Sequence, residues 1–250
     1  MRAKRFGWIL PICLGALLPA VCAAQAKAPS KAGAGGTDPA LLHPEKLTEK
    51  APDVFRVKFT TTKGSVVVEV TRAWAPLGAD RFYNLVKHHY FDQASFFRVL
   101  KSPRPFVVQF GINADPKVNA VWQGANIKDD PVTQHNVRGT ITFAMGGKDT
   151  RTSQVFINLA DNSRLDAMGF PPFGSVVEGM SVVEDLYGDY GEGAPSGRGP
   201  DQGRIQSEGK PYLDKEFPKL DSIVTAVIVV PEGSAPAKTP AKAPAKSPGL

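Results

Sequence analysis

Hydrophobic residues take alternate positions in two neighbouring stretches of the chain. In 55–59 every second residue is Phe or Val, with Arg and Lys between them, and in 66–70 Val recurs with the same period. The residues between these stretches, Thr61–Ser65, include Gly64 and are typical of a turn. A period of two places one face of a strand in the core. The pattern therefore predicts a β-hairpin with one buried face.

The hydrophobic period changes between residues 75 and 90. Phe82, Leu85 and Val86 fall on one face of a helix, and Pro76 suits its first turn. A second short helix is predicted over 180–187. Apolar runs of strand length, each bounded by Gly, Pro, Asn or Asp, are Ser95–Leu100, Phe106–Phe110, Gly139–Ala144, Gln154–Leu159, Phe173–Glu178 and Ser222–Val230.

Many short strands with two helices are typical of a closed β-barrel that is capped at its ends. The periodicity by itself supports only a β-rich fold with two helices. The strands and helices together span 54–230, which we predict to be one domain.

The first 24 residues have the three parts of a secretory signal peptide: a basic start, an apolar stretch and a series of small residues. Cleavage is expected after Ala24 or Ala26. An uncleaved membrane anchor is the alternative, although Pro11 and Pro19 would weaken such a helix. We therefore expect an exported protein, periplasmic or secreted, with no stable membrane span once the signal is removed.

Both cysteines, Cys13 and Cys22, lie inside the predicted signal peptide. Its removal would leave a mature protein without thiols, so no disulfide and no cysteine-ligated metal is expected. Residues 25–53 are interpreted as a linker with a short ordered stretch between Pro39 and Glu49. Residues 231–250 are rich in Ala, Lys and Pro and are predicted to be a disordered tail; a cationic binding arm is the alternative.

Overall composition is that of a globular protein, with 42% hydrophobic and 22% charged residues. Most of the formal net charge of +6 comes from lysines and arginines in the two terminal segments. The sequence pI of 9.3 therefore describes the ends more than the domain, and we expect no nucleic-acid partner.

Sequence signals for metal or covalent chemistry are missing. The four histidines are not at ligand spacing, and neither H-E-x-x-H nor G-x-S-x-G occurs. Asp129 and Asp130 precede Pro131 and are interpreted as a solvated pair in a loop. The glycine-rich stretch 188–204 lacks the spacing of a phosphate-binding loop. We expect no metal and no cofactor.

Four sequence elements occur in a distinctive order: FFRV at 96–99, FVVQFG at 106–111, FAMGG at 143–147 and SQVFIN at 153–158, followed by LDAMGFPPFG from Leu165. Together they resemble the cyclophilin family of peptidyl-prolyl cis-trans isomerases over about residues 55–230. The resemblance implies an eight-stranded antiparallel barrel with a helix over each end. It also implies isomerisation of X–Pro bonds in proline-containing polypeptides, assisting protein folding, and we expect a monomer.

The resemblance implies a role for ten residues. Arg98 matches the catalytic arginine, and Gln109 matches the glutamine that orients it. Ala144 and Met145 match the backbone that pairs with the peptide, and Gln154 lines a neighbouring pocket. The slot for the proline ring matches Phe106, Val107, Phe156, Leu165 and Phe170.

Several positions depart from the family pattern. Phe97 stands where many relatives have histidine, Met145 where many have asparagine, and Arg164 where some have tryptophan, which implies weak inhibition by cyclosporin. An extra Pro103 lengthens one loop, and residues 188–221 form a longer loop whose role the sequence does not reveal. The alternative function is a proline-peptide binding chaperone module without catalysis.

Overall fold

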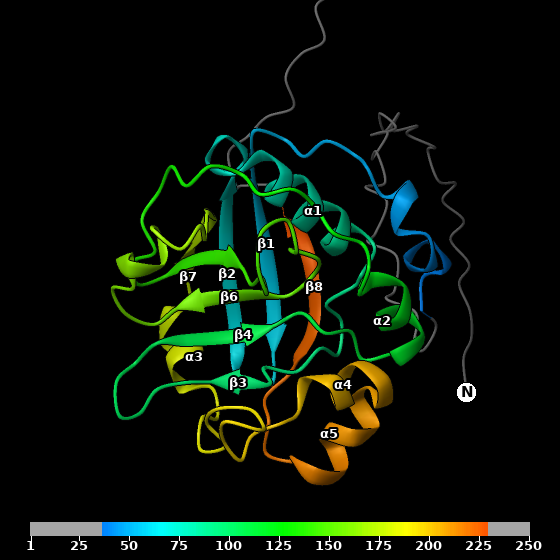
Figure 1. Cartoon of the computed structure of the whole chain (residues 1–250), viewed down its shortest axis with the longest axis vertical. Helices are drawn as coiled ribbons and strands as arrows, with labels where there is room; N and C mark the ends of the chain where they lie inside the picture. Colours follow the sequence, from blue (N-terminus) through cyan, green and yellow to red (C-terminus); the bar gives the residue numbers. More distant parts are fainter. Residues whose placement is uncertain (1–36, 230–250) are drawn as a thin grey trace, which may run out of the picture. The chain divides into compact units, whose positions relative to one another are not determined.

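The computed structural model describes residues 37–229, and eight strands in this range form one sheet. Their order across the sheet is β3-β4-β6-β5-β7-β2-β1-β8, and every neighbouring pair is antiparallel. Figure 1 shows the sheet curling around its interior. The strands are β1 (Val54–Thr61), β2 (Gly64–Thr71), β3 (Arg98–Val99), β4 (Val107–Phe110), β5 (Thr140–Phe143), β6 (Val155–Asn158), β7 (Pro172–Glu178) and β8 (Ile223–Val229).

The two edges of the sheet, β3 and β8, meet through the residues that precede them. Ser95 and Ser222 form an isolated bridge. Phe96 N–H donates to the Asp221 carbonyl at 3.0 Å, and Ile223 N–H donates to the Ala94 carbonyl at 2.8 Å. The predicted mainly β, antiparallel eight-stranded fold is confirmed, but the barrel is joined at one end rather than closed by a continuous ladder.

The interior of the curled sheet holds a cluster of aromatic rings. Phe59 packs edge-on against Phe91 and Phe110, with ring centroids 6.2 and 5.7 Å apart. The ring centroid of Phe82 in helix α1 (Pro76–Lys87) lies 4.9 Å from that of Phe173 in β7. These five side chains are at most 2% exposed. The alternating hydrophobic positions of 55–59 and 66–70 belong to the same main core.

The N-terminus of α1 is capped from a distant loop. Asp130 accepts hydrogen bonds from the N–H groups of Leu77 and Gly78 at 3.0 and 2.9 Å. It also forms an ion pair at 3.1 Å with Arg151, whose side chain is fully buried. A carboxylate satisfies the free N–H groups and the dipole of a helix start. The interpretation of the Asp129 and Asp130 pair as solvated was therefore wrong for Asp130, which is 7% exposed.

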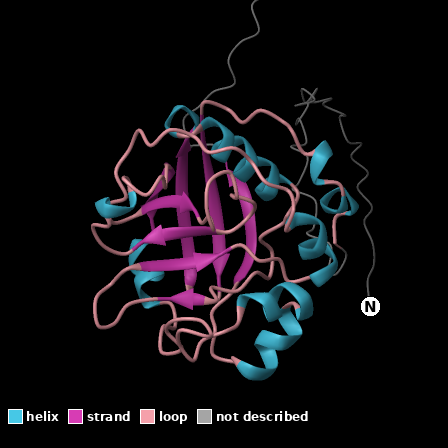
Figure 2. Ribbon diagram, in the orientation of Figure 1, coloured by secondary structure: helices cyan, strands magenta, loops and turns pink. Residues whose placement is uncertain are grey.

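Two helices were predicted, and the structure has five α-helices within residues 37–229. Helices α1 and α3 (Met180–Asp185) are the predicted ones. Three further helices of seven residues each were not predicted. They are α2 (Pro116–Trp122), α4 (Gln202–Glu208) and α5 (Lys210–Glu216). Figure 2 shows the helices around the outside of the sheet.

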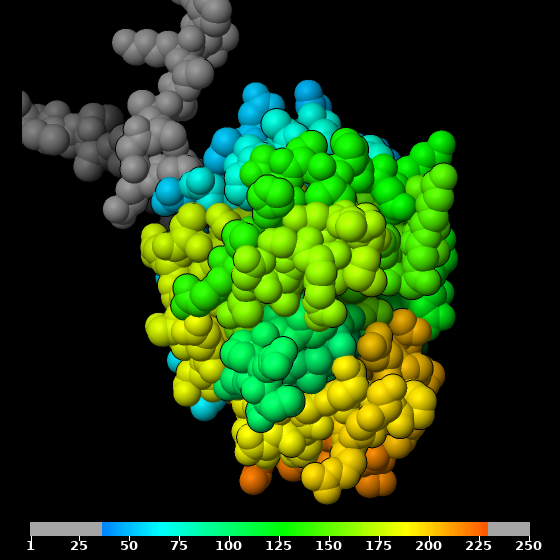
Figure 3. All heavy atoms as spheres, turned by 60° about the vertical axis from the view of Figure 1, so that its left-hand side comes forward, coloured from blue at the N-terminus to red at the C-terminus, as the bar shows by residue number. Residues whose placement is uncertain are grey.

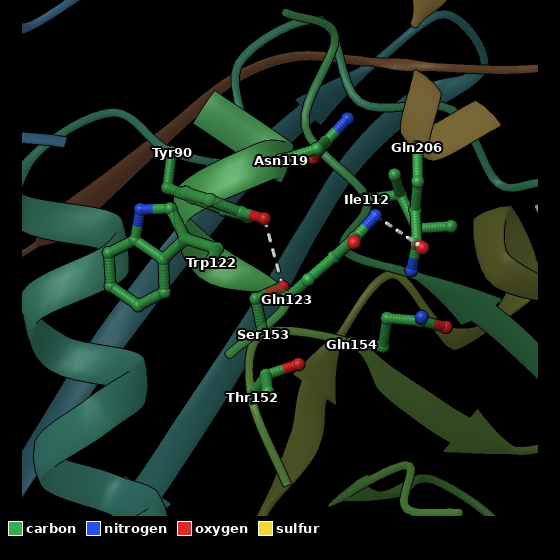
Figure 4. A pocket seen from close by; sticks show the side chains of 9 residues that line it. All are labelled: Tyr90, Ile112, Asn119, Trp122, Gln123, Thr152, Ser153, Gln154 and Gln206. Carbon is green, nitrogen blue, oxygen red and sulfur yellow. Dashed lines mark hydrogen bonds between the residues drawn. The ribbon is translucent and has the colours of Figure 1, made fainter. Parts of the chain in front are cut away.

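Helices α4 and α5 belong to the long loop after α3, and α4 packs against α2. Gln123, the residue that follows α2, donates from Nε2 to Oε1 of Gln206 in α4 at 2.6 Å. Figure 4 shows this contact beside a crevice of about 10 Å³, the size of one water molecule. Between the helices, Gly209 has a φ of +68°, and a Cβ there would lie 2.4 Å from the Ala114 carbonyl oxygen. These contacts hold the segment of α4 and α5 tightly against the rest of the domain.

Part of the segment interpreted as a linker packs on the domain. The short 3₁₀ helices η1 (Pro39–Leu42) and η2 (Pro44–Lys46) fall in the stretch predicted to be ordered. Leu41 is buried, and Asn84 of α1 donates to the Glu49 carbonyl at 2.7 Å. The remaining 3₁₀ helices are η3 (Arg72–Trp74) and η4 (Ser163–Leu165).

The predicted signal peptide, residues 1–24, and the predicted tail, residues 231–250, lie outside the described residues. None of the helices between residues 37 and 229 has the length and apolar character needed to cross a bilayer.

Candidate active site

Strand register places three predicted site residues side by side. Arg98 of β3 is opposite Gln109 of β4, and Gln109 is opposite Phe156 of β6. Residues opposite each other in a sheet lie on the same face. The intervening Val99 and Val108 point to the other face and belong to the main core. The period of two therefore separates the candidate site from the interior of the barrel.

A hydrogen-bonded chain connects the polar members of this row. Arg98 donates from Nη1 to Oε1 of Gln109 at 3.1 Å, and Gln109 donates from Nε2 to Oε1 of Gln154 at 2.9 Å. Gln109 is 7% exposed, so burial and two hydrogen bonds fix its amide. The amide in turn fixes one terminal nitrogen of the arginine.

Apolar side chains form a pocket beside Arg98. Val107, Phe156 and Leu165 are each at most 5% exposed and pack together as a separate small core. Phe156 contacts Phe170 edge-to-face with ring centroids 5.9 Å apart. The pocket has a volume of about 160 Å³. Its lining consists of Arg98, Phe106, Val107, Gln109, Ala144, Met145, Phe156, Leu165 and Phe170.

A second, more polar pocket of about 310 Å³ adjoins the first. Gln109, Ala144 and Met145 line both pockets, whereas Gln154 lines only the second. Ala144 N–H donates to the Gln154 carbonyl at 2.9 Å, so the backbone is held between the two. The structure thus brings all ten predicted site residues together. Gln202, at the start of α4, lines the second pocket and was not predicted.

Sequence analysis also missed Glu192, which is the partner of Arg98 on the other side. Arg98 donates from Nε and Nη2 to the two carboxylate oxygens of Glu192 at 2.6 and 2.7 Å. The hydrogen bonds from Arg98, and one from the Gly193 N–H, hold the pKa of Glu192 below its usual value. Glu192 lies in the glycine-rich stretch at 188–204. It is the sole acid between Gly191 and Pro200, a signal that could have directed attention to it.

Figure 3 shows the surface of this contact, with the yellow segment near residue 192 beside the green segment near residue 100.

Two cations lie near the ring of Phe106. The guanidinium carbon of Arg164 is 4.7 Å from the ring centroid, and that of Arg98 is 5.9 Å away. Arg164 therefore packs against one wall of the apolar pocket.

Arginine has five N–H donors. Three of those on Arg98 are used by Gln109 and Glu192, which leaves one on each terminal nitrogen. Arg98 can therefore donate up to two hydrogen bonds to a molecule whose apolar part fills the pocket. Among residues 37–229 no group of three or more His, Cys, Asp or Glu side chains could hold a metal ion.

Comparison with known proteins gives a consistent result. Residues 56–206 match the family model described as cyclophilin type peptidyl-prolyl cis-trans isomerase/CLD. Over 139 residues, 52% of this chain and 70% of the relative, the sequence is 34% identical to a peptidyl-prolyl cis-trans isomerase of Acinetobacter baylyi. It is 31% identical to the human peptidyl-prolyl cis-trans isomerase-like 3 over 52% of this chain and 80% of the relative.

A solved structure shares the fold. The crystal structure of a cyclophilin type peptidyl-prolyl cis-trans isomerase from Cryptosporidium parvum aligns with a TM-score of 0.51 and 19% identity. The alignment covers 71% of this chain and 98% of that one.

Proposed function

The chain belongs to the cyclophilin-type peptidyl-prolyl cis-trans isomerase family, and on that premise we propose how its residues divide the work of rotating an X–Pro bond. The enzyme is a peptidyl-prolyl cis-trans isomerase. Amide resonance gives this rotation a barrier of about 18–20 kcal/mol. The enzyme must bind the twisted amide more strongly than either planar form.

The apolar pocket supports the binding of the proline ring. Phe106, Phe156 and Leu165 line it together with Arg98. A proline ring held there brings its nitrogen to the arginine. In the twisted state that nitrogen loses its conjugation and its lone pair can accept a hydrogen bond. The two unused N–H donors of Arg98 are placed to supply it, as a stabilising interaction made chiefly in the transition state.

Gln109 and the second pocket complete the proposed site. The amide of Gln109 orients Arg98, and Gln154 holds that amide from the other side. The backbone at Ala144 and Met145, between the pockets, is proposed to pair with the substrate chain on either side of the proline. A binding module without catalysis is less well supported, because it would not require a fixed arginine at the pocket.

Substitution of Arg98 tests this proposal, and the juxtaposition of Arg98 with the apolar pocket is the observation that carries it. We expect Arg98→Ala to lower kcat/KM for a short proline peptide at least about tenfold, since a transition-state hydrogen bond from a charged group contributes roughly 1.5–3 kcal/mol. Arg56→Ala is the matched control, because Arg56 also lies on a strand and pairs with Glu69 at 2.8 Å. Wild-type turnover in Arg98→Ala would contradict the assignment.

Export is a further part of the proposal. It is supported by the basic, apolar and small-residue segments of residues 1–24, and it makes the protein a folding catalyst for exported polypeptides. Cell fractionation followed by N-terminal sequencing tests it: a mature start near residue 25 or 27 is expected, and a cytoplasmic protein beginning at Met1 would contradict it. A monomer that does not bind nucleic acid remains our prediction, to be checked by size-exclusion chromatography with and without added nucleic acid.

A further inference from the structure

The loop that carries Glu192 lies outside the sheet that carries Arg98. Glu192 nevertheless binds the Nε and Nη2 edge of the guanidinium with both carboxylate oxygens. A bidentate contact of this kind fixes the plane of the guanidinium as well as its position. Gln109 holds the remaining nitrogen, Nη1, so two separate parts of the chain determine where the free donors of Arg98 point.

Glycines around Glu192 hold its backbone tightly. The Glu192 carbonyl accepts a hydrogen bond from the Gly199 N–H at 2.8 Å, and its Oε1 accepts one from the Gly193 N–H at 2.9 Å. A Cβ on Gly197 would lie 2.2 Å from the Glu192 carbonyl oxygen, and one on Gly199 would lie 2.8 Å from it. Only residues without a Cβ allow the loop to fold this closely on Glu192.

The loop is also anchored at its ends. Tyr190 packs between Tyr187 and Phe217, with ring centroids 5.0 Å away in both cases. Phe217 in turn packs against Tyr212 of α5. The helices α4 and α5 are fastened to the barrel through a small apolar core, which contains Phe97, Ile112, Ile205, Tyr212 and Leu213. The carboxylate of Glu192 is therefore presented from a rigid support.

Stability alone does not account for this arrangement. The side chains of Arg98 and Glu192 are 20% and 38% exposed, and ion pairs this open to solvent contribute little to folding. We propose that Glu192 is a positioning residue of the isomerase reaction: it holds Arg98 from the loop side and directs the free terminal N–H groups to the twisted amide. The inference rests on the proposed role of Arg98.

Kinetics of Glu192 variants test the inference. Because the contact of Arg98 with the substrate strengthens in the transition state, we expect Glu192→Ala to lower kcat about tenfold with KM changed less than about twofold. Glu192→Gln keeps the shape and one acceptor, so it should lose less. Glu208→Gln is the control: Glu208 lies in the same loop and binds Arg204 through both oxygens at 2.7 and 3.2 Å, and its loss should leave kcat unchanged.

The same substitutions in an Arg98→Ala background separate positioning from general support. A residue that acts through Arg98 should have no further effect once Arg98 is absent. Equal losses in both backgrounds, or an unchanged or increased kcat in Glu192→Ala, would overturn the inference. If Arg98→Ala retains wild-type turnover, the proposed function of Arg98 fails instead, so the two failures are distinguishable.

Discussion

Arg98 is held on two sides by regions that are built in different ways. On the sheet side, strand pairing sets Gln109 opposite Arg98, so hydrogen bonds of the ladder determine the contact. On the loop side, Glu192 depends on close backbone packing at Gly197 and Gly199. The contact on the sheet side is set by the pairing of β3 with β4 and involves no glycine, whereas the contact on the loop side needs glycine at positions 197 and 199. The difference indicates that the two partners can be disturbed independently.

Removal of both partners of Arg98 should cause the largest loss of kcat/KM. In a Gln109→Ala, Glu192→Ala double variant the guanidinium has no fixed partner, and we expect kcat/KM within about threefold of that of Arg98→Ala. Each single variant should retain more activity than the double. A double variant with most of the wild-type activity would show that Arg98 needs neither partner.

Two glycine substitutions should distinguish the regions. A Cβ on Gly174 of β7 would lie 2.4 Å from the Glu69 carbonyl oxygen, so Gly174→Ala should lower the free energy of unfolding by about 2–4 kcal/mol. Gly197→Ala should instead displace Glu192 and lower kcat about five- to tenfold. Calorimetry and the peptide assay measure the two effects. The comparison breaks down if Gly197→Ala destabilises the barrel as much as Gly174→Ala.

Lowering the pH should weaken the contact of Arg98 with Glu192 and leave its contact with Gln109 unchanged. Hydrogen bonds from Arg98 and the Gly193 N–H keep the pKa of Glu192 below 4.5. A lowered pKa means that the ion pair is complete above 4.5 and is lost as the pH falls through the pKa in the folded protein. We expect kcat of the wild type to fall below pH 4.5 and that of Glu192→Gln to be lower but flat there. NMR exchange spectroscopy on an uncharged peptide measures this, over the range in which circular dichroism shows a native fold.

A substitution at the rim of the pocket should have the smallest effect on turnover. Arg164 stacks on Phe106 but donates to nothing in the row of Arg98, so Arg164→Trp should change kcat/KM less than about twofold. In the wild type, the charge of Arg164 would lose hydration against an uncharged ligand. Cyclosporin should therefore inhibit the wild type weakly and the Arg164→Trp variant more strongly. Nanomolar inhibition of the wild type would contradict this expectation.

The motifs that resemble the cyclophilin family predicted the sheet side of the candidate site, and nothing in the sequence analysis predicted the loop side. Arg98, Gln109 and Phe156 lie in short motifs on strands, where the side-chain period fixes which face each occupies. Glu192 lies in a stretch with no period, and its position depends on tight turns such as that at Gly191, with φ of +66°. The role of Asp130 as a helix cap was missed for a related reason, since the contact joins residues more than fifty positions apart.

The small apolar core beneath α4 and α5 limits how the long loop could be exchanged between proteins. Phe97 belongs to that core and is 2% exposed, and its neighbour in the chain is Arg98. A designer who grafts residues 188–221 onto a shorter relative would have to transplant Phe97 as well, because a histidine there would leave a polar ring against Ile205 and Leu213. The loop therefore cannot be exchanged by itself, because its docking site includes the residue that directly precedes Arg98.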